Sequence, residues 1–191
     1  MKGYSSDLYI LAFDHRGTLT KGLLGVEGRA PSGDEIARVS SMKDIIFDGF
    51  LEARNQGIEG GDPAILVDEA FGIQVQEKAK EMGIKFAAPV EKSGQKVFDF
   101  EYGDEFGEKI KEVNADFVKI LVRWNPDDDT DTRQIQGERI KRLSDWLDEN
   151  ERKFLLEFLV PASEQQLESV GGDQARYDSE IRPRLAVQVV E

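Results

Sequence analysis

Five short apolar runs recur along the chain, separated by stretches with the periodicity of helices. The runs are rich in Val, Ile, Leu and Phe, a composition typical of strands that are covered on both faces of a sheet. They occupy residues 8–14, 64–68, 84–92, 117–124 and 154–160. We therefore predict five buried strands.

Helical patterns fill the intervals between these runs. Ser32 and Glu35 have the spacing of a capping box, which predicts that a helix starts there. The residues that would share its apolar face are Ile36, Val39, Met42, Ile46 and Phe50. Further helices are predicted over residues 73–82 (closing at Gly83), 106–113, 133–149 and 181–191.

Strand and helix alternate five times, which requires crossover connections and a parallel sheet, either doubly wound or closed as a (β/α)8 barrel. Five units in this chain correspond to about 300 residues for eight, against about 250 in a typical barrel. No internal repeat or linker divides the sequence. We expect one α/β domain over residues 1–191, an incomplete (β/α)8 TIM barrel that stops before strand six.

Charged residues occur where an enclosed strand should have none. Lys119 interrupts FVKILV and Glu157 interrupts FLLEFLV, and an ion stranded in such a strand costs several kcal/mol. Three other runs end on charges: Asp14, Asp68, and the pair Glu91 and Lys92. The carboxyl ends of successive parallel strands are where α/β proteins build active sites.

Side chains alternate between the two faces of a strand, so the pattern predicts which charges can meet. Asp14, Asp68, Lys119 and Glu157 are expected at a common barrel mouth, and periodicity does not choose between Glu91 and Lys92 for the third strand. Candidates for contacts with substrate anions at the same mouth are His15, Arg16 and Arg123, although a lone histidine is more often a satisfied polar group.

A lysine beside carboxylates in an enclosed pocket suits reactions of carbonyl compounds. Desolvation or a neighbouring cation lowers the pKa of a lysine amine, which can then form a Schiff base while a carboxylate moves protons. The alternative is that Lys119 and Glu157 form an ion pair between adjacent strands that satisfies only itself. The residues alone leave both interpretations open.

The formal charge of −13 disfavours nucleic acid and anionic membranes as partners. The sequence has no cysteine, which excludes disulfides and thiolate metal sites, and His15 alone cannot supply the several imidazoles of many zinc enzymes. A carboxylate-bound Mg²⁺ is left open. No apolar stretch approaches the ~20 residues of a membrane span, and no signal peptide is recognisable, so we expect a cytoplasmic protein.

Several segments, in order, carry a family resemblance. They are LAFDHRGTL (11–19), ILVDEAFG (65–72), PVEKSG (89–94), FDFEYGDEFG (98–107), FVKILVRWNPDDD (117–129), RLSDWL (142–147), FLLEFLVPA (154–162) and Arg182 with Pro183. This series resembles the aldolase-like domain at the C-terminal end of 5-dehydro-2-deoxygluconokinase, in myo-inositol catabolism. More distantly it is similar to tagatose-bisphosphate and other class I aldolases of the TIM-barrel type.

The resemblance implies roles for individual residues. Asp14 would shuttle protons and contact substrate hydroxyls, Lys92 would bind the substrate, and Lys119 would keep the pKa of the nucleophilic lysine low. Glu157 would act as acid and base. The family's Schiff-base lysine lies on strand six, which has no counterpart before Glu191. No metal or organic cofactor is expected, because the protonated imine serves as the electron sink.

The implied reaction is cleavage or formation of a carbon–carbon bond in a phosphorylated keto sugar or sugar acid, possibly 5-dehydro-2-deoxygluconate 6-phosphate. Its products would be dihydroxyacetone phosphate and malonate semialdehyde. Either the sequence is a fragment of a longer protein, or an open half-barrel covers its exposed edge by pairing with another copy. We expect a homo-oligomer, with a sugar-kinase domain as a neighbour in the parent protein.

Two other interpretations compete. The segment AFDHRGTLT resembles the first motif of haloacid-dehalogenase phosphatases, but Arg16 replaces the second aspartate, and the acidic run at 127–129 is more simply a solvated loop. The alternative with more weight is a ligand-binding or regulatory domain, associated with a sugar kinase, that performs no catalysis.

Overall fold

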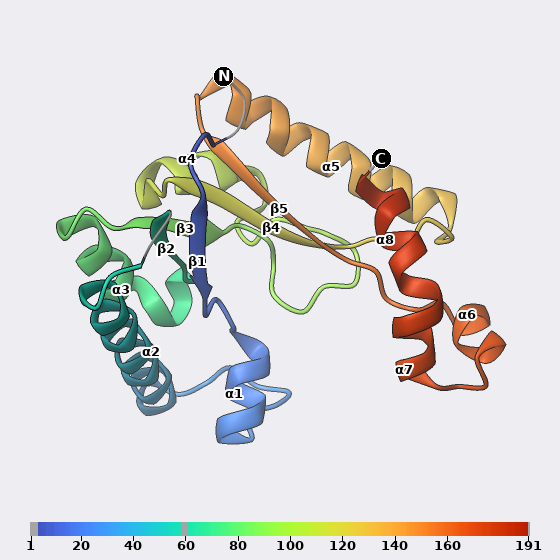
Figure 1. Ribbon diagram of the computed structural model, residues 1–191, viewed down its shortest axis with the longest axis horizontal. Coiled ribbons are helices and arrows are strands. Elements are labelled where there is room, and N and C mark those ends of the chain that lie inside the picture. The colour runs from blue at the N-terminus through green and yellow to red at the C-terminus, as the bar shows by residue number, and fades with distance from the viewer. Residues whose placement is uncertain (1–3, 59–60, 191) are drawn as a thin grey trace.

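A computed structural model describes residues 4–58 and 61–190 of the chain. Within them, parallel strands form one five-stranded sheet in the order β1-β2-β3-β4-β5. The strands are β1 (Leu8–Ala12), β2 (Asp62–Leu66), β3 (Lys85–Pro89), β4 (Phe117–Arg123) and β5 (Lys153–Leu159). The sheet is curled into a half-barrel (Figure 1). This α/β architecture is consistent with an incomplete TIM-like barrel.

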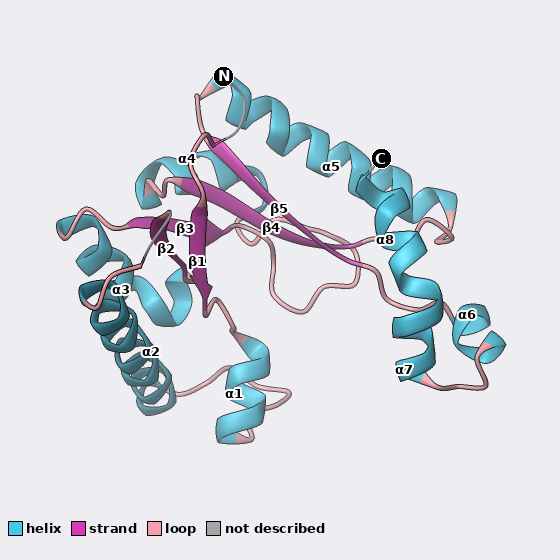
Figure 2. Ribbon diagram, in the orientation of Figure 1, coloured by secondary structure: helices cyan, strands magenta, loops and turns pink. Residues whose placement is uncertain are grey.

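Helices connect the strands and follow the last one (Figure 2). They are α1 (Gly17–Leu24), α2 (Gly33–Asn55), α3 (Glu69–Glu81), α4 (Phe106–Val113), α5 (Thr130–Glu149), α6 (Glu164–Ser169), α7 (Gln174–Arg176) and α8 (Arg182–Val190), with a 3₁₀ turn η1 (Gly103–Glu105) and a π-helical turn η2 (Tyr177–Ile181). Among residues 4–58 and 61–190, no helix combines the length and the apolar character needed to cross a membrane.

The convex face of the sheet carries two apolar cores. Residues of α2 and α3 pack on β2 and β3, around Phe47 and Phe86, and residues of α4 and α5 pack on β4, around Ile110 and Ile120. The concave face carries a smaller apolar layer built on Leu66, Ala87 and Phe117. Helices α6 to α8 gather beyond the end of β5 (Figure 1). Polar side chains can therefore lie on the concave face, above this small apolar layer.

Several predicted boundaries are confirmed by their local chemistry. Ser32 Oγ accepts a hydrogen bond from the backbone N–H of Glu35, and the Glu35 carboxylate accepts one from the N–H of Ser32, which completes the capping box. Gly83 follows α3 with a φ of 65°, the left-handed conformation that ends many helices.

Other boundaries differ. The second strand was predicted to continue to residue 68, but β2 ends at Leu66. The last predicted helix, 181–191, begins as α8 at Arg182 after the π-helical turn, and Glu191 lies outside the described residues. Helix α1 lies directly after the charged end of β1 and was not predicted.

The apolar face predicted for the helix that starts at Ser32, which is α2, is wrong in part. Ile36 and Ile46 are exposed, whereas Val39, Phe47 and Phe50 are buried. Lys43 occupies the same buried face and is 0% exposed. The helix therefore turns an amine, and not a full row of hydrocarbon side chains, toward the sheet.

Candidate functional site

Lys119 lies in the middle of β4 on the concave face of the sheet. Because side chains alternate along a strand, it shares this face with Phe117, which packs against Leu66 and Ala87 in the inner apolar layer. The Lys119 side chain is 2% exposed. The strand thus places an ammonium group directly above an apolar floor.

Three carboxylates surround this ammonium group. Asp14 Oδ2 lies 2.7 Å from Lys119 Nζ, Glu91 Oε1 lies 3.2 Å away and Glu157 Oε2 lies 3.3 Å away. Asp14 follows β1, Glu91 follows β3, and Glu157 is part of β5. Asp14 and Glu91 accept hydrogen bonds from Nζ, and Glu157 pairs with it by charge.

Arg16, the residue before α1, adds a second cation. Its Nη2 donates to Glu91 Oε1 over 2.8 Å, and its Nη1 donates to the backbone carbonyl of Glu91 over 2.8 Å. We refer to these residues together as the Lys119 cluster: Asp14, Arg16, Glu91, Lys119 and Glu157. Three carboxylates against two cations give the ionised cluster one net negative charge.

Burial and ion pairing act in opposite directions on the pKa values of the cluster. Burial alone would lower the pKa of Lys119, but the attraction of Glu91, Asp14 and Glu157 outweighs it, and the net pKa is raised. Burial raises the pKa of Glu91, and the positive charges of Lys119 and Arg16 only partly oppose this. Lys119 is therefore a permanent cation, because its carboxylate neighbours stabilise the charged form.

The cluster opens into a cavity of about 730 Å³ on the same side of the sheet. Further cationic side chains line this cavity: Lys21, Lys92 and Arg123. His15 also lines it, and Arg123 Nη1 donates to the carbonyl of Gln95 over 2.9 Å. Positive charge at the edge of the cavity, above a cluster rich in carboxylates, suits a ligand with both hydroxyl and anionic groups.

The third strand contributes two neighbouring residues in different ways. Ala87, Pro89 and Glu91 alternate onto the concave face, and the Glu91 backbone forms an antiparallel bridge with Phe100 that holds it there. Lys92 is exposed and lines the cavity from its edge. Periodicity did not decide whether Glu91 or Lys92 lies on the concave face. The structure places Glu91 beside Lys119 and Lys92 at the edge of the cavity.

Asp68 was expected at the common mouth, and the structure places it elsewhere. Because β2 ends at Leu66, Asp68 is the N-cap of α3, where its Oδ2 accepts a hydrogen bond from the N–H of Phe71 over 2.9 Å. Its Oδ1 pairs with Lys43 Nζ, and both side chains are almost wholly enclosed, 1% and 0% exposed. This carboxylate has its own buried partner and takes no part in the Lys119 cluster.

The Lys43–Asp68 pair also fixes the chain that carries Asp14. Lys43 Nζ donates to the carbonyl of Phe13 over 2.7 Å and to that of His15 over 3.1 Å. Burial lowers the pKa of Lys43 and raises that of Asp68, so the enclosure moves both groups toward their neutral forms. Residues 13–15 are thus held from behind by α2 while Asp14 faces Lys119.

Sequence reasoning missed Lys43, Lys21 and α1. A signal for Lys43 was present, since Val39, Lys43 and Phe47 follow one another at intervals of four and so share one helix face. A charged residue in the middle of such a row indicates a buried pair when a carboxylate ends a neighbouring strand.

The phosphatase interpretation finds no support in the acidic run after β4. Asp128 accepts from the N–H of Asn125, Asp129 caps α5 through the N–H of Thr132, and Asp127 accepts from Gln166. Each of these carboxylates therefore has a structural role in its loop. In residues 4–58 and 61–190, no group of three or more His, Cys, Asp or Glu side chains is arranged to hold a metal ion.

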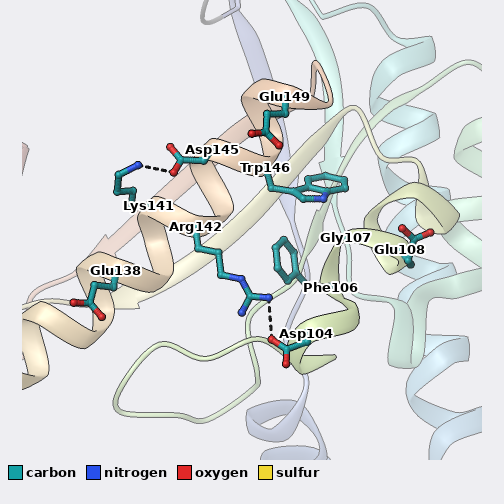
Figure 3. A pocket seen from close by; sticks show the side chains of 10 residues that line it. All are labelled: Asp104, Phe106, Gly107, Glu108, Glu138, Lys141, Arg142, Asp145, Trp146 and Glu149. Atoms are coloured by element: carbon teal, nitrogen blue, oxygen red, sulfur yellow. Dashed lines mark hydrogen bonds and ion pairs between the residues drawn. The ribbon is translucent and has the colours of Figure 1, made fainter.

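A second hollow lies between α4 and α5, on the convex side (Figure 3). Phe106 and Trp146 line it, Arg142 pairs with Asp104 over 2.8 Å, and Lys141 pairs with Asp145 over 2.5 Å. Its charged side chains are all exposed, so the groups in it are solvated. The concave cavity is the stronger candidate because its charges are buried and convergent.

Fold and site together define a parallel α/β half-barrel with a charged cluster at the carboxyl ends of its strands. The chain belongs to the family DUF2090, described as an uncharacterized protein conserved in bacteria, whose family model matches residues 2–183. A search of the curated proteins found no match.

Proposed function

We propose that the protein is a carbon–carbon lyase of the class I aldolase kind that acts on a phosphorylated keto sugar or sugar acid. The observation that carries the proposal is the Lys119 ammonium group at the floor of a cavity of about 730 Å³, where three carboxylates surround it, one in β5 and two just after β1 and β3. The sequence resemblance supplies the reaction class and 5-dehydro-2-deoxygluconate 6-phosphate as the substrate to test first.

Asp14 and Glu157 are the proton-transfer groups in this proposal. Asp14 is 16% exposed and Glu157 is 46% exposed, so both carboxylates can reach a ligand while they remain next to Lys119. In the cleavage direction, a carboxylate takes the proton of the hydroxyl beside the bond that breaks. The electron pair of that bond forms a double bond to the carbonyl-derived carbon, the protonated imine nitrogen takes up the displaced pair, and the aldehyde fragment leaves.

Lys119 acts as a fixed positive charge and not as the nucleophile. Asp14 and Glu91 accept hydrogen bonds from its Nζ, Glu157 forms an ion pair with it, and its pKa is raised, so it offers no free electron pair for attack on a carbonyl. The resemblance assigns the Schiff base to a lysine on a strand beyond β5. Lys92 and Arg123, with Lys21, would hold the phosphate or carboxylate of the ligand at the cavity edge.

The test is borohydride trapping on the full-length gene product. The sugar acid phosphate and a panel of ketose phosphates are incubated with borohydride, adducts are located by mass spectrometry, and dihydroxyacetone phosphate release is assayed in parallel. We expect an adduct on a lysine other than Lys119, and loss of release in Lys119→Met. Lys141→Met, which removes an exposed lysine of α5, is the matched control. Absence of both adduct and release with every compound would refute the lyase.

The second candidate is a ligand-binding domain without catalysis. The three ion pairs of Lys119 favour it, because an ammonium group held by carboxylates suits recognition better than covalent chemistry. Calorimetric binding of the same compounds, unaccompanied by turnover or adduct, would support this function over the lyase.

A further inference from the structure

Helix α1 begins differently from the longer helices α2, α3 and α5. Each of those is capped by a side chain that accepts a hydrogen bond from an N–H of its first turn: Ser32, Asp68 and Asp129. In α1, the side chain of Arg16 at the N-cap makes no such bond, and the first turn has no acidic residue. The N–H groups of Gly17 and Thr18 have no hydrogen-bond partner in residues 4–58 and 61–190. N–H groups of this kind carry a partial positive charge and favour an anion.

The start of α1 forms part of the wall of the concave cavity. Gly17 and Thr18 both line the cavity, and α1 lies just beyond the end of β1 (Figure 1). The loop after β3 faces this wall, since Ser93 Oγ lies 3.9 Å from the point that a Cβ atom on Gly17 would occupy. The Ser93 side chain is exposed, so its hydroxyl is available to the same ligand. Backbone and hydroxyl donors thus meet in one part of the cavity.

Two lysines bring full positive charge to the same part of the cavity. Lys92, which precedes Ser93, lines the cavity and has no ion pair in the part of the chain that the structure describes. Lys21 lies one turn after Gly17 and also lines it. The ion pair of Lys21 with Glu27, over 2.6 Å, joins side chains that are 62% and 69% exposed. A surface pair of this kind is weak, so an anionic ligand can take the place of Glu27.

A buried oxygen beside the start of α1 indicates what else the ligand must carry. The guanidinium of Arg16 donates to the backbone carbonyl and to Oε1 of Glu91, both over 2.8 Å, which ties Glu91 to the residue before α1. Glu91 lines the cavity with a side chain that is 9% exposed, and its Oε2 has no hydrogen-bond partner among the described residues. Arg16 and Lys119 favour the ionised form of Glu91, whose oxygens only accept hydrogen bonds. A hydroxyl group of the ligand would supply the missing donor.

We propose that the N-terminus of α1 binds the anionic group of the ligand while Glu91 Oε2 accepts a hydrogen bond from one of the ligand's hydroxyl groups. The ligand is then a hydroxylated anion, such as a sugar phosphate or a sugar acid. This inference deepens the lyase proposal, on which it rests for the reaction, by assigning the two ends of the substrate. The anion lies beside N–H groups and lysines, and the uncharged hydroxyl side of the ligand meets the carboxylates, which would repel an anion.

The experiment is calorimetric binding of three small probes to the full-length gene product. Glycerol phosphate carries both groups, propyl phosphate keeps the phosphate but has no hydroxyl group on its carbon chain, and glycerol has no anion. We expect glycerol phosphate to bind about tenfold more tightly than propyl phosphate, because only the first offers a donor to Glu91 Oε2. Glycerol should show no binding at the same concentrations. In Glu91→Met, the two phosphates should bind equally.

The anion site itself is tested by Thr18→Asp. The new carboxylate lies in the first turn of α1, where it repels an anion, so glycerol phosphate should bind at least about tenfold more weakly. The same carboxylate suits the start of a helix, so the free energy of unfolding should not fall, and loss of binding is not loss of fold. Thr130→Asp, which makes the same change at the start of α5 and outside the cavity, is the matched control.

Equal affinity of Thr18→Asp and Thr130→Asp for glycerol phosphate would overturn the anion site. Equal affinity of the wild-type protein for the two phosphates would overturn the role of Glu91, even if Glu91→Met fails to fold, and no binding of either phosphate at millimolar concentration would overturn both. These measurements need no turnover, so their failure leaves the borohydride test of the lyase to decide that proposal. Binding as expected, without adduct or release, would refute the lyase and leave this inference in place.

Discussion

Lys43 and Lys119 are both buried lysines that pair with carboxylates, 0% and 2% exposed, yet their surroundings differ in kind. Lys43 has one carboxylate partner, Asp68, and its other donors go to backbone carbonyls. Lys119 has three carboxylate partners and no backbone partner among the contacts of its Nζ. The pair closed by backbone groups supports the fold, whereas the cluster with excess carboxylates beside a cavity is where we propose that a ligand binds.

The difference follows from where each amine enters the sheet. Lys43 comes from α2 and reaches the ends of β1 and β2 from the convex side, where helices cover it. Lys119 comes from β4 and stands on the concave side, where the cavity begins. The same residue type thus meets an enclosed environment in one place and an accessible one in the other.

The largest effect on stability is expected for Lys43→Met. Loss of this amine leaves Asp68 buried without its partner and two carbonyls without a donor, and breaking a buried pair in this way costs about 3–5 kcal/mol. Urea unfolding measures the free energy. Lys78→Met is the control, because Lys78 joins the same two helices at the surface through Asp44, and its loss should cost less than about 1 kcal/mol.

The double variant Lys43→Met with Asp68→Asn sharpens this prediction. Asparagine can still cap α3 and leaves no unpaired charge in the interior, so part of the lost stability should return. Equal stability of Lys43→Met and Lys78→Met would mean that the buried pair does not support the fold.

A smaller loss is expected for Lys119→Met. The carboxylates of Asp14 and Glu157 can reach the water of the cavity, so they are not left stranded, and we expect a cost of about 1–3 kcal/mol. Binding of anionic sugars should be lost in the same variant. Calorimetry with a ketose phosphate, compared with Lys43→Met at a temperature where that variant is folded, separates the two roles. If Lys119→Met binds the ketose phosphate as the wild-type protein does, Lys119 has no role in binding, and the contrast between the two lysines is wrong.

The pH dependence of stability should reveal Glu91. Its pKa is raised in the folded protein, so its contribution is fully present below the ordinary value of 4.5 and is lost as the pH rises through the folded value. The slope reaches at most about 1.4 kcal/mol per pH unit. In Glu91→Gln, urea unfolding should show a flatter profile above pH 4.5. Parallel profiles for the two proteins would argue against a raised pKa.

The smallest change in stability is expected for Glu157→Gln. The side chain is 46% exposed and keeps its shape, so the free energy of unfolding should change by less than about 1 kcal/mol. Turnover of the full-length product should fall by about 10²–10⁴-fold, the usual contribution of general acid–base catalysis. Glu149→Gln, on the surface of α5, provides the matched control for both measurements. Wild-type turnover would remove Glu157 from the mechanism.

How far the sequence predicts this molecule depends on what decides each feature. Period-two alternation brought Asp14, Lys119 and Glu157 to one place, because a strand leaves its side chains only two directions. Asp68 could not be placed this way, since the end of β2 at Leu66 and the start of α3 depend on the cap and on Lys43. A run that ends in a carboxylate reads the same whether that residue closes a strand or caps a helix.

Lys43 shows the other limit of sequence patterns. Helix α2 has apolar residues on several sides, including the exposed Ile36 and Ile45, so no single face stands out. Which face is buried is settled by the sheet against which it packs. The four-residue spacing of Val39, Lys43 and Phe47 therefore identifies Lys43 as buried only once the face that meets the sheet is known.

The π-helical turn before α8 aligns two apolar side chains that an unbroken helix would separate. In an unbroken α-helix, Tyr177 and Leu185 are eight residues apart and would point about 80° away from each other. One additional residue in a wider turn reduces that angle to about 20°, and both side chains reach the same apolar cluster with Val160. Deletion of one residue within 177–181 would therefore turn Tyr177 and Leu185 away from each other and loosen the cluster in which α8 packs against the end of β5.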